Sequence, residues 1–300
     1  MMSQVPHPIP YQGSKRKLAP TIYGFIPRDI DAFYEPFAGS AAMTLYMASR
    51  GAANRYIIAD KFETIIDLWQ MIVDEPRETA DRYEEVWQGF SEENPGYFNE
   101  VRARYNENRD PVDLLYLVCR CVKNAVRFNS AGNFTQSADK RRKGTNPKKM
   151  RAAIFDASEL LKGRTEFRKG DWVTTSCDAT VRDFVYMDPP YLGTSVGPDK
   201  RYHQQLEQEP LISGLAELNA RNIRFALSYD GMTGDKEYGP ALPGELGMHR
   251  LLLHAGRSTQ ATLQGKSSET VESLYLSRDL DAPERTRIEQ LKTAQQSLAL

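Results

Sequence analysis

The stretch AFYEPFAGSAAMTLYMASRGAANRYIIAD, residues 32–60, decides the fold class of this chain. Its apolar start ends in the small residues FAGSA, a pattern typical of a strand followed by a tight turn. The segment AAMTLYMASRG predicts a helix that ends at Gly51, and RYIIAD predicts a second strand. Strand, helix and strand at this spacing indicate parallel strands joined by a crossover helix.

The pattern continues along the chain. One face of a helix is predicted by the helical spacing of Phe62, Ile65, Ile66, Trp69, Ile72 and Val73. Further strands are predicted at residues 165–172, 183–191, 223–230, 247–255 and 270–277. We therefore expect an α/β fold whose sheet is mixed, with a C-terminal antiparallel hairpin.

A segment of different character interrupts the strands. Residues 76–126 are charged and helical, with breaks at 93–96 and 108–111, and residues 127–147 form a polar, turn-rich loop. A loop of this length inside a domain is usually functional or disordered. We expect a catalytic domain of residues 1–76 and 156–280, a helical insert of residues 77–155, and a C-terminal tail helix of residues 281–300.

Composition excludes several classes of protein. The 300 residues include 39 basic and 40 acidic side chains, so the net charge of −1 gives no hint of a partner. Three cysteines without a CxxC pair argue against a disulfide scaffold or a zinc ribbon, and no metal site is expected. The start is not a signal peptide, and no apolar run is long enough to span a membrane. A cytoplasmic protein is expected.

The turn after the first strand, residues 35–41, is a candidate ligand site. Its small residues allow a ligand to approach the backbone, and the following helix offers free N–H groups. Asp60 ends the next strand, where an acid would meet the ribose hydroxyls of a nucleoside. The turn lacks a GxGxxG pattern, which makes a dinucleotide site unlikely but leaves an adenosyl ligand open. A plain tight strand–helix connection is the alternative.

The second candidate is Asp188-Pro189-Pro190-Tyr191, directly after the buried run 184–187. Neither proline can continue a central strand, and together they hold a rigid exposed corner. That corner presents a carboxylate, a carbonyl and an aromatic ring, which suit a planar base that carries an amino group. A simple Pro-Pro loop is the alternative, and the nucleoside-type turn in the same sheet argues against it.

These motifs, in this order, resemble the Dam-like adenine-N6 DNA methyltransferases, the D12 class of the α group. The likeness covers roughly residues 8–278. It includes YQGSK at 11–15, EPFAG at 35–39, IAD at 58–60, GDW at 170–172 and DPPY at 188–191. In the insert, RFNSAGNF at 127–134 resembles the start of the family's target-recognition loop. Tyr11 stands where the family usually has Trp. The residues after Phe134 are basic, whereas the family has a short Val-Pro continuation there. The resemblance therefore does not predict which DNA sequence is recognised.

The resemblance implies a Rossmann-like methyltransferase sheet that binds S-adenosylmethionine. The implied cofactor-binding residues are Tyr11, Lys15, Phe37, Ala38, Gly39, Asp60, Asp171, Trp172 and Asp188. Lys15 would meet the methionine carboxylate, although SKRK is also typical of a solvated helix start. Asp188 and the Pro189 carbonyl would accept from the amine of a flipped adenine, and Tyr191 would stack on its ring.

The insert carries the candidate DNA contacts. Residues 140–151 contain seven basic side chains and no acid, which fits either phosphate binding or a solvated loop. A polar connection at 257–266, between the last two strands, is either a DNA-facing loop or a plain exposed hairpin. The candidate nucleic-acid-binding residues are Arg127, Asn129, Asn133, Lys140, Arg141, Arg142, Lys143, Lys148, Lys149, Arg257 and Lys266, with Arg151 at the end of the basic tract.

The first hypothesis is a site-specific adenine-N6 methyltransferase of duplex DNA. It would serve as the modification half of a restriction system, whose endonuclease acts separately, or stand alone. One alternative is an RNA adenine-N6 methyltransferase, against which the long insert and the late DPPY motif argue by resemblance. The other is a catalytically silent nucleic-acid-binding relative, against which the intact motif of residues 188–191 argues.

Overall fold

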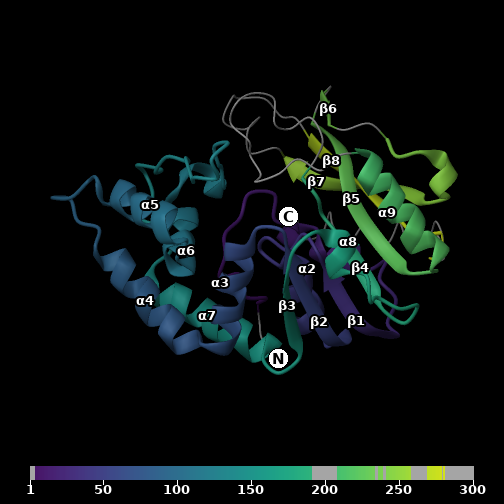
Figure 1. Cartoon of the computed structure of the whole chain (residues 1–300), viewed down its shortest axis with the longest axis horizontal. Helices are drawn as coiled ribbons and strands as arrows, with labels where there is room; N and C mark the ends of the chain where they lie inside the picture. Colours follow the sequence, from purple (N-terminus) through teal and green to yellow (C-terminus); the bar gives the residue numbers. More distant parts are fainter. Residues whose placement is uncertain are drawn as a thin grey trace.

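A mixed β-sheet forms the centre of the computed structural model, which describes residues 4–190, 208–233, 236–238, 241–257, 269–278 and 280 (Figure 1). Its strands follow the order β3-β2-β1-β4-β5-β8-β7, with β6 paired to β5. The strands are β1 Ile30–Glu35, β2 Ala53–Asp60, β3 Thr165–Lys169, β4 Phe184–Met187, β5 Arg224–Thr233, β6 Lys236–Tyr238, β7 His249–Arg257 and β8 Glu269–Leu276. Strands β1 to β5 are parallel neighbours, and β8 is antiparallel to both β5 and β7. The predicted mixed sheet and C-terminal hairpin are confirmed.

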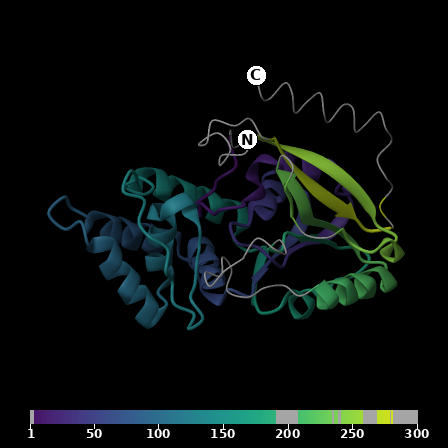
Figure 2. The same cartoon turned by 90° about the horizontal axis from the view of Figure 1, so that it is seen from above.

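Helices cover both faces of the sheet. They are α1 Ala19–Tyr23, α2 Ala42–Ser49, α3 Glu63–Asp74, α4 Pro76–Gln88, α5 Tyr97–Asn108, α6 Pro111–Arg120, α7 Pro147–Leu161, α8 Trp172–Thr175 and α9 Gln208–Ala220, with short 3-10 turns η1 Lys15–Lys17, η2 Val122–Asn124 and η3 Gly244–Leu246. Alternation along β1 and β4 sends Phe33 and Phe184 to a first apolar cluster, together with α2 and α3. Tyr34 and Val185 face a second cluster with α8 and α9. Figure 2 shows α9, in green, on one side of the sheet and the purple N-terminal helices on the other.

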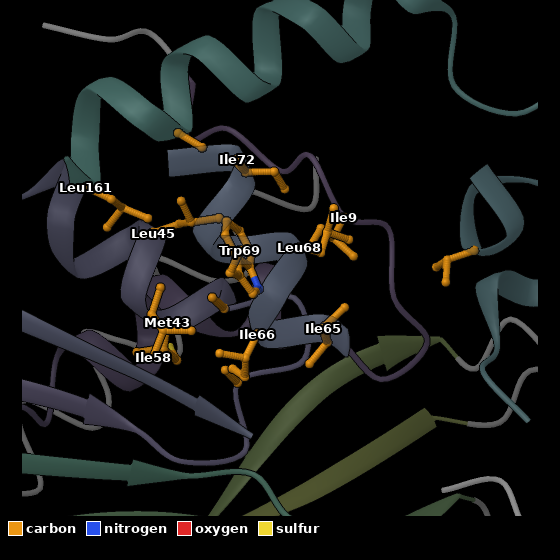
Figure 3. Packing of buried hydrophobic residues seen from close by; sticks show 14 of the residues in the cluster. Ile9, Met43, Leu45, Ile58, Ile65, Ile66, Leu68, Trp69, Ile72 and Leu161 are labelled. Carbon is orange, nitrogen blue, oxygen red and sulfur yellow. The ribbon is translucent and has the colours of Figure 1, made fainter. Parts of the chain in front are cut away.

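Helix α3 anchors the first cluster. Trp69 is fully buried, and Figure 3 shows its ring among Leu45 of α2, Leu68 and Ile72. Its Nε1 donates to the carbonyl of Gly39 over 2.9 Å, so the core helix also fixes the turn after β1. The helical face predicted for residues 62–73 is confirmed.

The insert segment forms a helical lobe of α4 to α7 beside the sheet (Figure 1). Helix α7 returns the chain to the sheet, where Leu161 joins the first apolar cluster. The Ser158 hydroxyl of α7 donates to the carbonyl of Val73 over 2.6 Å. The expected insert limit at residue 155 falls inside α7, and apolar side chains of the lobe belong to the same cluster as those of α2 and α3.

Two expected strands are too long, and one helix was not predicted. The strand expected at 183–191 ends at Met187, before the two prolines. The strand expected at 165–172 ends at Lys169, because Gly170 takes a φ of +140° and the Asp171 side chain caps α8 by accepting from Val173 N. Helix α9 was not predicted, since Gly214 weakens its helical pattern. A Cβ at Gly214 would lie 2.4 Å from the Trp172 ring, so the glycine allows α9 to pack on that ring.

No helix in the described part of the chain combines the length and the apolar character that a bilayer crossing requires. The tail helix expected at residues 281–300 lies outside the described residues.

Candidate active site

The two motifs singled out in the sequence meet where the strand order reverses. The chain passes from β1 towards β2 on one side, while β4, on the other side of β1, leads to β5. Ligands of open α/β sheets bind outside the carboxyl ends of the strands at such a switch point. Phe33 of β1 pairs with Phe184 of β4, and Tyr34 pairs with Val185. The turn after Glu35 and the corner at Asp188 therefore leave the sheet side by side.

A network of hydrogen bonds fixes the turn after β1. Gly39, at φ +45°, donates its N–H to Oδ2 of Asp60 over 3.0 Å. Phe62 N donates to the other oxygen, Oδ1, over 2.9 Å. Burial raises the pKa of Asp60 to about 6, although the backbone donors of Phe62 and Gly39 oppose that shift. Asp60 thus ties the first turn to the start of α3, and each of its oxygens keeps a further lone pair for a ligand.

Tyr11 lies against the glycine of this turn. A Cβ built on Gly39 would lie 3.6 Å from the Tyr11 ring, so the missing side chain leaves bare backbone facing an aromatic ring. Ser40 and Ser14 link the same two segments through their hydroxyls, 2.8 Å apart. The turn, the Tyr11 ring and the Asp60 carboxylate together form a cradle outside the carboxyl ends of β1 and β2.

Glu35 holds the start of α2. The helix begins after Ala41, which has a φ of +46° and no capping side chain. Instead the Glu35 carboxylate accepts from Thr44 N over 2.7 Å and from Met43 N over 3.4 Å. Burial raises the pKa of Glu35 to about 7, against the hydrogen bonds from Thr44 and Met43. The sequence showed this residue as part of a motif but gave no sign of its capping role.

Asp188 faces a buried lysine from the N-terminal segment. Lys15 Nζ lies 2.6 Å from Oδ1 and 2.8 Å from Oδ2 of Asp188, and 3.3 Å from the Gly13 carbonyl. Burial raises the pKa of Asp188 to about 6, the Lys15 charge lowers it, and the charge of Glu272 raises it again. Lys15 was expected over the methionine portion of the cofactor; the structure places its ammonium on the Asp188 carboxylate.

Glu272 is a site residue that sequence reasoning missed. Its Oε2 lies 3.5 Å from Lys15 Nζ, on the side of the sheet that α2 covers. The signal was present in β8, where Glu272 shares a face with the core residues Leu274 and Leu276 and breaks their apolar row. Nearby, the hydroxyls of Tyr186 and Ser228 are 3.0 Å apart, and burial raises the pKa of Tyr186 well above its usual value.

Three further residues that the resemblance assigns to the cofactor differ in their surroundings. Trp172 is only 3% exposed and belongs to the second apolar cluster. Phe37 packs beside it, with ring centroids 6.2 Å apart. Asp171 is exposed, caps α8, and lies 3.9 Å from the ammonium of Lys61. Their expected contacts with the cofactor stay predictions.

The sequence matches one protein family over most of its length. The family is described as D12 class N6 adenine-specific DNA methyltransferase, and the match covers residues 11–277. The chain belongs to this family. The fold class and the family predicted from the sequence are thereby confirmed.

Curated relatives are more distant. The type II methyltransferase M.FokI of Planomicrobium okeanokoites is 25% identical over 91% of this chain and 43% of its own length. The modification methylase LlaI of Lactococcus lactis subsp. lactis is 28% identical over 74% of this chain and 36% of its own. The retron Ec67 DNA adenine methylase of Escherichia coli is 27% identical over 56% and 60%. The chain thus spans less than half the length of the first two relatives.

The segment that resembles the family's recognition loop is held by aromatic contacts. Phe128 packs against Phe62, directly after the Asp60 turn, at a centroid distance of 5.1 Å, and against Phe134 at 6.0 Å. Asn129 accepts through Oδ1 from the N–H groups of Ala131 and Asn133 over 3.0 and 2.9 Å. Its side chain therefore shapes the loop tip in the structure.

The remaining polar side chains of this loop differ in their environment. Arg109 donates to Oδ1 of Asn133 over 3.2 Å. Arg127 is half-buried, and its Nε lacks a hydrogen-bond partner in the described structure. Direct contacts of Arg127, Asn129 and Asn133 with DNA stay predictions.

The basic tract contains arginines that form salt bridges and lysines that form none with the described residues. Arg141 and Arg142 both lie near Asp139, at 3.3 and 3.4 Å. Arg151 is paired with Asp81 at 2.6 Å and with Glu84 at 3.1 Å. Within the basic tract, the exposed lysines that form no salt bridge with a described residue are Lys140, Lys143, Lys148 and Lys149. These four are the strongest candidates for phosphate contacts.

Several candidate residues cannot be placed. Tyr191 and Lys266 lie outside the described residues, as does the side chain of Arg257 at the end of β7. Among the described residues, no group of three or more His, Cys, Asp or Glu side chains could hold a metal ion. Cys119 and Cys121 are free and buried.

Proposed function

We propose that this chain is a site-specific adenine-N6 methyltransferase of duplex DNA that uses S-adenosylmethionine. The observation that carries the proposal is the pairing of two sites at the switch point of the sheet. The cradle of Gly39, Asp60 and Tyr11 suits a nucleoside, and the carboxylate of Asp188 suits an amine beside it. Membership of the family supports the same reaction.

The residues present fit the proposed cofactor. Gly39 leaves open the space that a Cβ would fill below the Tyr11 ring, and Asp60 offers acceptors for ribose hydroxyls. Phe37, Ala38, Asp171 and Trp172 would complete the cradle. When bound, S-adenosylmethionine supplies an electrophilic methyl group on a sulfonium.

The chain's own contribution is to position and polarise the adenine amine. The lone pair of that amine is delocalised into the ring, which makes it a weak nucleophile. Acceptors at Asp188 Oδ and at the Pro189 carbonyl would hold both N–H bonds and favour a tetrahedral nitrogen. The negative charge of Asp188 would also stabilise the positive charge that develops on the amine. Pro190 keeps the corner rigid, and Tyr191 would stack on the ring.

The target base is enclosed in a DNA duplex, so it must be flipped out to reach this corner. The lysines of the basic tract and the loop of residues 127–134 would bind the duplex while the base is extruded. Relatives named as modification methylases support a role in DNA modification. In a restriction–modification system we expect the endonuclease to act separately, and we expect this chain to act in a prokaryotic or phage cytoplasm.

The test is to offer methyl-labelled S-adenosylmethionine with duplex DNA, single-stranded DNA or RNA of random sequence. The proposal expects label in duplex DNA, with methylated adenines that share a short flanking sequence. Label in RNA alone would favour the RNA methyltransferase. Cofactor and DNA binding without any transfer would favour the catalytically silent relative.

A further inference from the structure

Lys15 lies between two carboxylates from different strands. Its Nζ is 2.6 Å from Asp188, which follows β4, and 3.5 Å from Glu272 of β8. The three side chains are largely enclosed, with exposed fractions of 7% for Lys15, 19% for Asp188 and 18% for Glu272. Charges this close attract strongly when little water surrounds them.

Irregular pairing in the two neighbouring strands, β5 and β7, flanks Glu272 of β8. The register between β5 and β8 shifts between Ser228 and Gly231, and the register between β7 and β8 shifts between His254 and Gly256. Such bulges redirect side chains and occur often beside active sites. Gly231 pairs with Glu272, and a Cβ at Gly231 would lie only 2.5 Å from the Val271 carbonyl.

The position of Lys15 is in conflict with the proposed reaction. Its ammonium contacts both oxygens of Asp188, and the adenine amine needs at least one of those acceptors. The substrate amine would compete with Lys15 for the Asp188 carboxylate, and a buried ammonium that leaves one carboxylate without reaching another is strongly destabilising. A second carboxylate within reach would offset that cost.

We propose that Glu272 is a positioning residue that receives the Lys15 ammonium while Asp188 accepts the amine of the substrate. This inference rests on the proposed function, and it deepens it by adding a residue outside the motifs of the sequence. Lys15 would then alternate between two carboxylates. In the structure described here it is on Asp188, with Glu272 next to it.

The titratable groups that face Asp188 decide how the site responds to a substitution. They are Lys15, Glu272, Glu35 and Tyr186. The Glu272 charge raises the pKa of Asp188, so its removal should lower that pKa. The same removal should hold Lys15 more firmly on Asp188 and slow the reaction.

The test compares Glu272→Gln with Glu166→Gln. Glu166 also forms a carboxylate–cation pair on a strand, with Arg168 at 2.7 Å, but at the edge of the sheet in β3. The first measurement follows the titration of Asp188 by NMR in ligand-free protein with ¹³C-labelled aspartate carboxyls, assigned with Asp188→Asn. Glu272→Gln should move the midpoint to lower pH, and Glu166→Gln should leave it unchanged.

The second measurement is the single-turnover methylation rate. Glu272→Gln should lower the rate on the pH plateau by roughly 10- to 100-fold, as expected for misplaced reacting groups. Glu272→Asp, which keeps the charge, should restore part of it. In a Lys15→Met background, Glu272→Gln should change the rate no further, because Glu272 acts through the lysine.

The outcomes separate this inference from the proposed function. Wild-type protein that methylates DNA, together with a Glu272→Gln variant of unchanged Asp188 titration or unchanged rate, would overturn the role of Glu272 alone. An additive loss in the Lys15→Met background would also overturn it. Wild-type protein that methylates no DNA would remove the proposed function, while an unchanged Asp188 titration would still count against Glu272.

Discussion

Lys15 and Asp188 are 173 residues apart in the chain, yet the ammonium of one contacts both carboxylate oxygens of the other, at 2.6 and 2.8 Å. This contact joins the N-terminal segment to the corner after β4. It places a buried cation on the carboxylate that we propose to bind the adenine amine. The reactivity of the site therefore depends on which partner Asp188 has.

The first prediction concerns the pH dependence of methyl transfer. Only the ionised Asp188 carries the negative charge that would stabilise the developing positive charge on the substrate amine, and burial raises the pKa of this carboxyl to about 6. The rate should therefore be constant above pH 7 and fall about tenfold per pH unit well below the pKa. Single-turnover rates between pH 5 and 8.5 would show this, with circular dichroism at each pH as a control for unfolding. A rate independent of pH down to 5 would contradict the role of Asp188.

The second prediction uses two glycines of similar backbone conformation. Gly39 has a φ of +45° and Gly51 a φ of +59°, so alanine at either position should cost about 1 kcal/mol of stability through backbone strain. Only Gly39 faces the Tyr11 ring, whereas a Cβ at Gly51 meets nothing within 4 Å.

Gly39→Ala should therefore also weaken the binding of S-adenosylmethionine by roughly tenfold, since the added methyl crowds the cradle. Gly51→Ala should keep wild-type affinity. Calorimetric titration measures the affinity of both variants for the cofactor, and thermal melts measure the loss of stability from backbone strain. Equal affinities of the two variants for S-adenosylmethionine would show that the cofactor does not bind at the Gly39 turn.

The third prediction concerns the four exposed lysines of the basic tract that form no salt bridge with a described residue. Lys148 and Lys149 lie in the first turn of α7, where the helix dipole disfavours cations, so their presence costs stability and favours a binding role. Replacing them together with Lys140 and Lys143 by glutamine should weaken binding to all DNA sequences alike. The slope of log affinity against log salt should fall by about 3.6, at roughly 0.9 for each phosphate contact.

Arg151→Gln is the matched control, because Arg151 is paired with Asp81 and Glu84. It should leave the salt slope unchanged. Fluorescence anisotropy with labelled duplexes at several salt concentrations measures both proteins. An unchanged slope in the variant with four substitutions would support the alternative interpretation, in which the tract is a solvated loop that does not bind phosphates.

The fourth prediction concerns Glu35 and folding stability. Its pKa is raised from 4.5 to about 7 by burial, so the folded state favours the neutral carboxyl. The stability that this group contributes is present below pH 4.5 and is lost as pH rises through 7, by roughly 3 kcal/mol in total. Glu35→Gln lacks this titration. The unfolding free energy of the wild type, relative to that of Glu35→Gln, should therefore fall as the pH rises from 5 to 8.

Chemical denaturation at several pH values measures that difference. The other carboxyls are present in both proteins, so their contributions cancel. A difference that stays constant over this range would show that Glu35 does not titrate in the folded state.

Much of the site could be predicted because its residues stand next to strand ends. Gly39, Asp60 and Asp188 each follow an apolar run, and parallel strands bring their carboxyl ends to one edge of the sheet. The structure places all three there. Strands and helices are recognised by apolar residues that repeat every two or every 3.6 positions. This pattern is local in the sequence, so it is enough to locate residues at strand ends.

What could not be predicted depends on contacts between distant segments. Glu272 reaches Lys15 only because β8 lies between β5 and β7 with shifted registers on both sides. Glu35 caps α2 from the preceding strand, which no local capping pattern signals. The buried position of Trp172 results from a glycine in α9, 42 positions further along the chain, at Gly214.

The most direct test of the central claim is the identity of the methylated nucleoside and its dependence on Asp188. Duplex DNA of random sequence is incubated with purified protein and methyl-labelled S-adenosylmethionine, digested, and analysed by mass spectrometry. Wild-type protein should produce labelled N6-methyldeoxyadenosine, and folded Asp188→Ala protein should produce at least about 100-fold less. Label on another base, no label in DNA, or a folded Asp188→Ala protein of near wild-type activity would contradict the account.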